Sequence, residues 1–456
     1  MIMLLLSAIS LSIVALITLA VNPIAGIPLL FMVKPVVDAV YLEPLLFGLR
    51  LPELVGGLAP MIVFVHMLFV GPERALGRMP LRSIWIVYAV DVCVFSMIIA
   101  YDQSFMEGVN IFLRYINGFV GFYMVQAFFY NDPEKNLRRL LLALIVAGFF
   151  PIGIGVYQMA TGAVWKSAST EGITRYIGLY HDAFTVRFYA FQTIFALVLY
   201  GALYGGRNLF IKGSVLAYCV ASTVAMIGAY SKAGVVSLVM WVTSWALLQK
   251  KIALFLLIIL CGGILGIYYA PQIAANITQM FHKEIGALEG KVKLERTFAG
   301  RWYGWEEMIS RWEEFNWLKK GFGSGEVAVG AHNDYLQMLF HGGIFGLMIY
   351  LFLLSAVGWT IVSNLRTKID PMSIAAFMLL LMWLVDAIGL VPSSYPGYQW
   401  FVWGFIGLSL RVREEVGRAA ERPDLSQEAT LSRELPGGLA LPPALTAERR
   451  FPSLLR

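Results

Sequence analysis

Apolar runs near the length of a membrane span, roughly 20 residues, recur along almost the whole chain. In lipid, only helices and closed barrels satisfy every backbone polar group. The runs stand at about 3–21, 54–71, 84–101, 109–130, 139–160, 183–204, 211–229, 233–248, 252–270, 333–358, 372–390 and 398–411. The chain is 59% hydrophobic and only 14% charged, against about 25% charged in soluble domains. The sequence therefore predicts an all-α polytopic membrane protein with about twelve transmembrane helices.

The segment Ile24–Leu42 is interrupted by Lys34, Pro35 and Asp38. It fits either an additional crossing or a helix that lies at the membrane interface. The opening Met-Ile-Met-Leu-Leu-Leu lacks the basic residues of a signal peptide, so we expect the first run to remain as a membrane helix. The cysteines all lie inside apolar runs, where a thiol is normally a packing residue, and they imply neither a disulfide nor a metal framework. They are Cys93, Cys219 and Cys261.

Basic residues mark the side of the membrane that faces the cytoplasm. They gather in alternate short connections and are Arg74, Arg78, Arg82, Lys135, Arg138, Arg139, Arg207, Lys212, Lys250, Lys251, Arg366, Lys368, Arg411 and Arg413. The one large connection, residues 271–331, then faces outward. We therefore expect a transmembrane domain over residues 1–410 that includes this outer loop. Residues 411–456, rich in Arg, Glu, Pro and Gly, are predicted to form a disordered cytoplasmic tail.

The most informative local segment is Ala331–Leu354, where a polar His-Asn-Asp opening runs directly into an apolar stretch. Ionisable residues at membrane depth are costly and usually mark a substrate or ion site, and a helix N-terminus attracts anions. Asn333 or Asp334 fits as the helix cap, which leaves His332 to face a ligand. An ordinary histidine pKa of about 6.5 suits a general base. His332 is therefore the candidate catalytic residue.

Five cations remain on the outer side, where the positive-inside rule disfavours them. They are Arg114, Arg175, Arg187, Lys232 and Arg301. A single one is as easily a side chain that snorkels to the interface. Five near one membrane level indicate an anionic partner, and Arg binds phosphate oxygens through paired, charge-assisted bonds. The sequence thus predicts that these residues bind a diphosphate-bearing headgroup at the outer leaflet.

Further polar or glycine-rich segments lie on the same side. His181 and Asp182 open a helix, and they either position an acceptor sugar or cap that helix. Residues 301–320 have the pattern of an amphipathic interfacial helix, and the glycines of residues 321–325 suggest a flexible link. His341 lies beside Gly342 and Gly346, whose spacing favours close helix packing.

Together these segments resemble the O-antigen ligase and O-antigen polymerase superfamily of bacterial membrane glycosyltransferases. The resemblance covers about residues 175–354. Its most specific element is His332-Asn333-Asp334-Tyr335-Leu336 with the following Gly342-Gly343 and Gly346-Leu347, similar to the family's His-Asn-x-Tyr-Leu and Gly-x-x-Gly-Leu pattern. Ser231-Lys232-Ala233-Gly234 resembles a Ser-Arg-x-Gly turn, with Lys in place of the usual Arg. Gly300-Arg301, Trp305 and Gly321-Phe322-Gly323 resemble the loop that precedes the histidine.

The resemblance implies a glycosyltransferase C-like fold with its active site on the periplasmic side of the bacterial inner membrane. It also implies inverting transfer from a polyprenyl diphosphate-linked glycan, without a cofactor, metal or nucleotide sugar. His332 would deprotonate the acceptor hydroxyl, and the residues assigned to acceptor positioning are His181, Asp182, Asn333 and Tyr335.

Several functions remain open on this sequence, among them that of a protein O-glycosylating relative. The acceptor is a second lipid-linked glycan in a polymerase and a lipid A core in a ligase, and we favour polymerisation of surface polysaccharide or exopolysaccharide. Both readings have glycans and membrane lipids as partners, and no nucleic acid. The rival of another class is a transporter or flippase for a lipid-linked glycan. Against it, the two halves of the chain show no repeat, and the cations lie at one face rather than at mid-depth.

Overall fold

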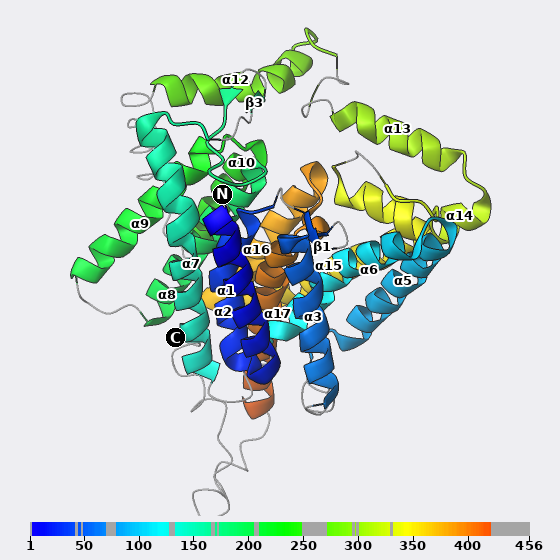
Figure 1. Cartoon of the computed structure of the whole chain (residues 1–456), viewed down its shortest axis with the longest axis horizontal. Helices are drawn as coiled ribbons and strands as arrows, with labels where there is room; N and C mark the ends of the chain where they lie inside the picture. The colour runs from blue at the N-terminus through cyan, green and yellow to red at the C-terminus, as the bar shows by residue number, and fades with distance from the viewer. Residues whose placement is uncertain are drawn as a thin grey trace, which may run out of the picture.

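The structure is a computed structural model of the chain, and helices dominate it (Figure 1). It describes residues 2–41, 44–46, 49–69, 79–126, 133–165, 169–170, 173–204, 209–248, 271–293, 297, 301–328 and 332–420. The helices are α1 (Ile2–Val21), α2 (Pro23–Asp38), α3 (Leu51–Phe69), α5 (Arg82–Asp102), α6 (Phe105–Gln126), α7 (Pro133–Thr161), α8 (Ala183–Tyr204), α9 (Leu209–Gly228), α10 (Lys232–Leu248), α12 (Pro271–Leu288), α13 (Arg301–Glu313), α14 (Trp317–Phe322), α15 (Asp334–Thr367), α16 (Pro371–Gly389), the 3₁₀ turn η4 (Pro392–Ser394) and α17 (Pro396–Ala420).

Strands are confined to two short antiparallel pairs in the described part of the chain. Strand β1 (Pro44–Leu46) pairs with β2 (Leu49–Arg50), with Pro44 opposite Arg50. Strand β3 (Ser169–Thr170) pairs with β4 (Ile173–Thr174), with Ser169 opposite Thr174. Both pairs belong to connections between helices, so the prediction of an all-α fold is confirmed.

Seven helices of the described residues are long and apolar enough to cross a membrane: α1, α5, α7, α8, α9, α15 and α16. Two shorter apolar helices, in α3 and α10, add to them. Every predicted apolar run that falls in the described residues coincides with a helix, whereas the run at 252–270 lies outside them. The chain is therefore a helical membrane protein by the length and composition of its helices.

Helix α2 forms from the segment that we left open between a crossing and an interfacial helix. It packs beside α1 and α7, and a Cβ added at Gly26 would lie 2.2 Å from the Cα of Leu19, so α1 and α2 touch backbone to backbone. Its charges are internal: buried Lys34 pairs with Asp38, and Asp38 accepts a 2.5 Å hydrogen bond from Tyr189 of α8. The segment is thus a packed bundle helix whose charges neutralise each other.

Helices α6 and α17 form the centre of the core. A Cβ added at Gly404 would lie 2.4 Å from Val125, so the small residue lets the two helices approach closely. The buried indole of Trp400 donates to Asn117 at 2.7 Å. Helix α17 continues past residue 410, where we expected the tail to begin, because buried Arg411 donates to the carbonyl of Gln126 at 3.1 Å. The rest of the expected tail, residues 421–456, lies outside the described residues.

The segment predicted to be the outer loop, residues 271–331, carries α12 and α13, which lie across one end of the bundle (Figure 1). The amphipathic stretch predicted over residues 301–320 is broken into α13 and α14, because the side chain of Asn316 accepts from the Lys319 amide at 3.0 Å and caps a new helix. Within the stretch Met308 is buried, whereas the neighbouring Ile309 is 40% exposed.

The glycine-rich segment 321–325 is not the flexible link that we expected. Gly323 adopts φ +114°, and a Cβ there would lie 1.8 Å from the carbonyl oxygen of His341. The amide of Ser324 donates to Phe340 at 2.9 Å. His341 completes the attachment, since one ring nitrogen accepts from the Ala328 amide at 2.9 Å and the other bonds Tyr115 at 3.0 Å. Glycine therefore provides close approach here, and the segment is pinned to α15.

Replacing Gly323 with Ala should destabilise the protein strongly. The positive φ alone costs about 1–3 kcal/mol for a residue with a Cβ, and the contact with the His341 carbonyl adds to that cost. Thermal unfolding in detergent measures the effect, with Gly213→Ala as the control, because a Cβ at Gly213 meets no atom within 4 Å. Equal melting temperatures for the two variants would show that the segment is loosely held.

Candidate active site

A cavity of about 1060 Å³ opens at the end of the bundle that α12 and α13 cover. Its wall is built from the ends of α2, α3, α6, α8, α10 and α16, the start of α17, and residues of the outer loop. The wall includes His332, together with Arg114, Arg175, His181, Asp182, Lys232 and Arg301. Residues as far apart in the chain as Arg114 and His332, which are separated by 218 positions, thus line the same cavity. Most residues that the sequence singled out are brought together.

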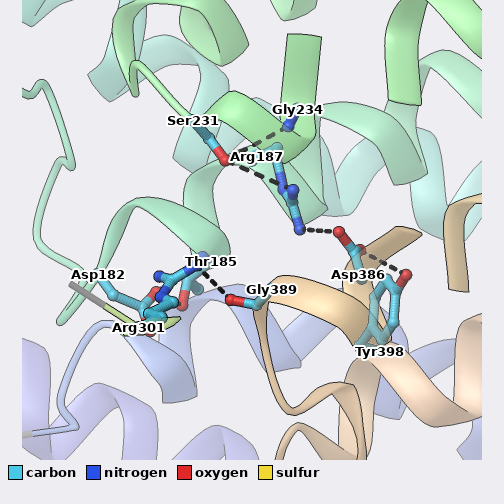
Figure 2. Close-up of polar contacts among 9 residues, drawn as sticks. All are labelled: Asp182, Thr185, Arg187, Ser231, Gly234, Arg301, Asp386, Gly389 and Tyr398. Carbon is cyan, nitrogen blue, oxygen red and sulfur yellow. Dashed lines mark hydrogen bonds and ion pairs between the residues drawn. The ribbon is translucent and has the colours of Figure 1, made fainter. Parts of the chain in front are cut away.

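Arg301, at the start of α13, reaches the carbonyl oxygen of Gly389 at the end of α16 (Figure 2). Burial lowers the pKa of its guanidinium, and the positive charges of Arg175 and Arg187 lower it further. The guanidinium of Arg301 is therefore close enough to those of Arg175 and Arg187 to be repelled by both. Such a cluster is stabilised by an anion, and phosphate suits the planar donor fork of arginine.

Arg187 is placed differently from our prediction. It is only 1% exposed and its side chain does not contribute to the cavity wall. Figure 2 shows its guanidinium between α10 and α16, where it donates to Asp386 at 2.7 Å and to Ser231 at 3.4 Å. Gly234 makes room for it, because a Cβ there would lie 2.7 Å from the Arg187 Cδ. Arg187 thus acts behind the wall, and a carboxylate already neutralises it.

Lys232 is the first residue of α10, and its ammonium lies 2.8 Å from both carboxylate oxygens of Glu284 on α12. The preceding Ser231 side chain accepts from the Gly234 amide at 3.4 Å at the start of the helix. Lys232 and Glu284 both line the cavity. A phosphate that contacts Lys232 must therefore compete with, or displace, a carboxylate of the outer loop.

His332 stands immediately before α15 in a left-handed backbone conformation, with φ +40°. This conformation is uncommon for a residue with a Cβ and is concentrated at functional sites. The imidazole is exposed on the cavity wall, yet partial burial lowers its pKa, and the charge of Arg301 lowers it further. His332 is therefore neutral at pH 7 and able to accept a proton.

Asn333, Asp334 and Tyr335 hold α15 against its neighbours. Asn333 caps the helix by accepting from the Leu336 amide at 3.0 Å, and its amide group donates to Ile388 at 3.1 Å. Asp334 accepts from Ser393 at 2.5 Å and from Tyr350 at 3.1 Å. Tyr335 donates to the Leu384 carbonyl at 3.4 Å. Asn333 and Tyr335 are absent from the cavity wall, so their contacts fix His332 rather than reach an acceptor.

His181 and Asp182 line the cavity at the start of α8. Of the two roles we left open, capping is present: Asp182 accepts from the Thr185 amide at 2.9 Å, and also from Tyr395 at 2.7 Å. The His181 ring lies 4.8 Å from that of Tyr41. Burial raises the pKa of Asp182, but hydrogen bonds from His181, Tyr395 and Thr185 lower it to below its ordinary value. This carboxylate is charged at pH 7 and suited to bind hydroxyl groups.

Arg114 lies on α6 and lines the same cavity. Its guanidinium donates to Gln337 of α15, and its carbonyl accepts from Gln399 of α17 at 2.8 Å. In Figure 1, α6 and α8 stand on opposite sides of α16 and α17. The partners of Arg114, on α15 and α17, therefore differ from those of Arg187 and Arg301.

Sequence reasoning missed the carboxylates and tyrosines that organise the cations. Glu284, Asp386, Tyr41 and Tyr395 received no role, although each contacts a residue that we had selected. One signal was present: Asp386 lies inside an apolar run, where an ionised carboxylate requires a partner. No pattern in the chain identifies that partner as Arg187, which lies 199 residues earlier.

Comparison with models of known protein families and with curated proteins finds no match. The function must therefore be argued from this cavity and its residues.

Removing the buried carboxylate should destabilise the protein more than removing the whole ion pair. Asp386→Ala leaves Arg187 buried and uncompensated, a change that costs about 3–5 kcal/mol in typical cases. The double change Arg187→Leu with Asp386→Leu removes both charges and should cost less. Chemical unfolding in detergent measures both. A double variant that is less stable than Asp386→Ala would show that the pair itself contributes net stability.

Proposed function

We propose that this protein is an inverting membrane glycosyltransferase that uses a polyprenyl diphosphate-linked glycan as donor. The observation that supports the proposal is a neutral histidine, His332, on the wall of a cavity that also carries Arg175 and Arg301. Glycosyl transfer from a lipid diphosphate needs these two elements: a base for the incoming hydroxyl and cations for the departing diphosphate.

In the proposed reaction, an acceptor hydroxyl attacks the anomeric carbon of the donor. The new oxygen–carbon bond forms as the bond from that carbon to the diphosphate oxygen breaks. The hydroxyl proton goes to His332, and the electron pair of the broken bond leaves with the polyprenyl diphosphate. Arg175 and Arg301 stabilise the charge on the leaving group, an effect often worth about 3 kcal/mol per donor. A single displacement inverts the anomeric centre.

Supporting groups act on these residues without contacting the reacting atoms. Arg187, held by Asp386 at 2.7 Å, lies behind the wall and contributes to the lowered pKa of Arg301. Asp182 faces the cavity as a charged acceptor of hydrogen bonds. We propose that Asp182 binds a hydroxyl group of the acceptor sugar. The rings of His181 and Tyr41 line the cavity beside it.

The setting of this chemistry also belongs to the proposal. About twelve crossings in a glycosyltransferase C-like arrangement would place the cavity and the outer loop on the periplasmic side of a bacterial inner membrane, where polyprenyl diphosphate glycans supply their own energy. We favour polymerisation of surface polysaccharide or exopolysaccharide over ligation to a lipid A core. A transporter of lipid-linked glycan is disfavoured because the two halves of the chain show no sequence repeat.

His332→Ala should reduce transfer by about 10²–10⁴-fold without loss of folding. The measurement is glycan length after incubation of the purified protein, in nanodiscs, with polyprenyl diphosphate-linked oligosaccharide. His282→Ala is the matched control, because His282 is exposed on α12 and lies outside the cavity. Retained turnover in His332→Ala would remove the catalytic role. Unchanged glycan length with wild type, and no modified lipid A core, would favour transport.

The pH profile should report the lowered pKa of His332. Because burial and Arg301 lower that pKa, kcat/KM should rise with pH through a midpoint below the ordinary value of about 6.5 and stay level at neutral pH. Arg301→Gln removes one cause, so its midpoint should move to higher pH even though its rate falls. Arg311→Gln, on the exposed side of the same helix, should leave the midpoint in place. An Arg301→Gln midpoint equal to wild type would contradict this assignment.

A further inference from the structure

The apolar residues of α13 mostly pack inside the protein. Met308 is buried in a cluster with Ala328 and with Phe340 of α15, and Trp305 and Phe315 pack against the same cluster. The ring centroids of Phe315 and Phe340 lie 5.4 Å apart. The amphipathic pattern of α13 is therefore explained by contact with α15, and it does not indicate contact with lipid.

The short helix α14 differs, because its apolar side chains remain uncovered. Trp317 is 77% exposed, and Leu318 and Phe322 are exposed as well. Residues 317–322 are all described, and none of them is buried. Large apolar side chains that gather on a surface mark a contact with another molecule or with a membrane. Helix α14 therefore requires a partner that the rest of the chain does not supply.

The turn between α5 and α6 lies beside α14 and is apolar as well (Figure 1). The Lys319 ammonium lies 3.8 Å from the carboxylate of Asp102, the last residue of α5. Tyr101 precedes this aspartate and Phe105 begins α6, and both side chains are exposed. One ion pair thus brings together two exposed apolar segments that lie far apart in the chain.

The same surface continues onto α15. Phe322 stacks on Phe345 of α15, with ring centroids 5.0 Å apart, and Phe345 is 52% exposed. Ile344, Met348 and Phe352 are also exposed, at the spacing of one helix face. Helix α15 is long and apolar enough to cross a membrane, so its exposed apolar side faces lipid. Helix α14 is therefore continuous with a lipid-facing surface.

Helix α14 also carries two lysines and no acidic residue. The ammonium of Lys320 lies 5.6 Å from the ring centroid of Trp312. Trp and Tyr are enriched where a membrane meets water, and a lysine extends its ammonium to that level while its stem lies along apolar surface. Aromatic rings, apolar side chains and lysines on one surface thus fit the headgroup region of a bilayer, whose phosphates are negative.

From this geometry we propose that α14 and the α5–α6 turn are seated in the headgroup region of the membrane leaflet on the side of the cavity, with Lys320 binding lipid phosphate. The surface that makes this contact, the α14 surface, consists of Tyr101, Phe105, Trp317, Leu318, Phe322 and Phe345. The occupant is the bilayer rather than a second protein, because the α14 surface is continuous with the lipid-facing side of α15.

The lipid contact has a consequence for the cavity wall. Residues 321–325 overlap the end of α14 and are pinned to α15 through Gly323 and Ser324. A bilayer that holds α14 therefore also holds the segment that leads to His332. This contact does not require any particular reaction in the cavity.

Photolabelling of the unmodified protein tests the contact. The full chain is placed in nanodiscs of phosphatidylcholine and phosphatidylglycerol that contain a phospholipid with a diazirine in its headgroup. After illumination, the lipid adducts are located by mass spectrometry. Adducts should form on residues 317–322 and 101–105, and be absent from the exposed Tyr303 and Ile309 of α13. No adducts on α14, or equal adducts on α13 and α14, would overturn the proposal.

A fluorescent label at one position distinguishes lipid from water and from protein. In a background with Cys93→Ser, Cys219→Ser and Cys261→Ser, the label is attached through Trp317→Cys or, as the matched control on α13, through Ile309→Cys. The label at position 317 should lose most of its fluorescence to a phospholipid with a nitroxide in its headgroup and little to iodide in the water. The label at position 309 should show the reverse.

Two results of the labelling would contradict the assignment. If iodide quenches the label at position 317 as strongly as the label at 309, α14 lies in water. If neither quencher reaches it, protein covers the α14 surface. Leu318→Cys and Phe105→Cys repeat the measurement, so that one variant that fails to fold does not decide the outcome.

The lysine is tested separately by the same photolabelling. Lys320→Gln should lose most of the headgroup adducts on α14, because the lysine no longer binds lipid phosphate. Arg311→Gln is the matched control, since Arg311 lies on α13 and pairs with Glu326, and it should keep the adducts. Equal adducts in the two variants would exclude Lys320 from lipid binding.

Discussion

The buried ion pair between Arg187 and Asp386 is the interaction on which the site depends. Its two side chains are 2% and 1% exposed, and they lie 2.7 Å apart in an apolar bundle. Because an unpaired charge at this depth is costly, the pair fixes α8 against α16, and Tyr398 of α17 donates to the same carboxylate at 2.7 Å. The last turn of α16 then presents the Gly389 carbonyl that holds Arg301 (Figure 2). One electrostatic requirement thus positions an outer-loop residue over the cavity.

The cations also differ in the groups that neutralise their charge. Arg187 and Lys232 are matched with Asp386 and Glu284, so their charges are largely committed within the protein. The guanidinium groups of Arg175 and Arg301 lie near each other, and their repulsion lowers the pKa of Arg301. An anionic headgroup relieves that repulsion without a change of fold. The cations that the sequence presents as equivalent thus differ in their surroundings: Arg187 is buried behind the cavity wall, whereas Arg175 and Arg301 line the cavity.

His332 shows how a histidine is held at such a wall. Its left-handed backbone, φ +40°, is maintained on the C-terminal side by Asn333, which caps α15 and bonds Ile388. Glycines bring residues 321–325 against α15 near His341, which bonds Ala328. The glycines that suggested flexibility in the sequence instead allow backbone contact, because they carry no Cβ. Strain at His332 is thus supported by ordinary hydrogen bonds at its neighbours.

The sequence by itself determined that the chain is an all-α membrane protein, because apolar runs near the membrane thickness leave the backbone no other way to satisfy its polar groups. It also selected His332, Arg175 and Arg301, since polar residues at helix ends in an apolar chain are few. Only the tertiary structure decided the partners: Asp386 for Arg187, Glu284 for Lys232 and Gln337 for Arg114. Such pairings join residues far apart in the chain, and local spacing carries no information about which helices lie side by side.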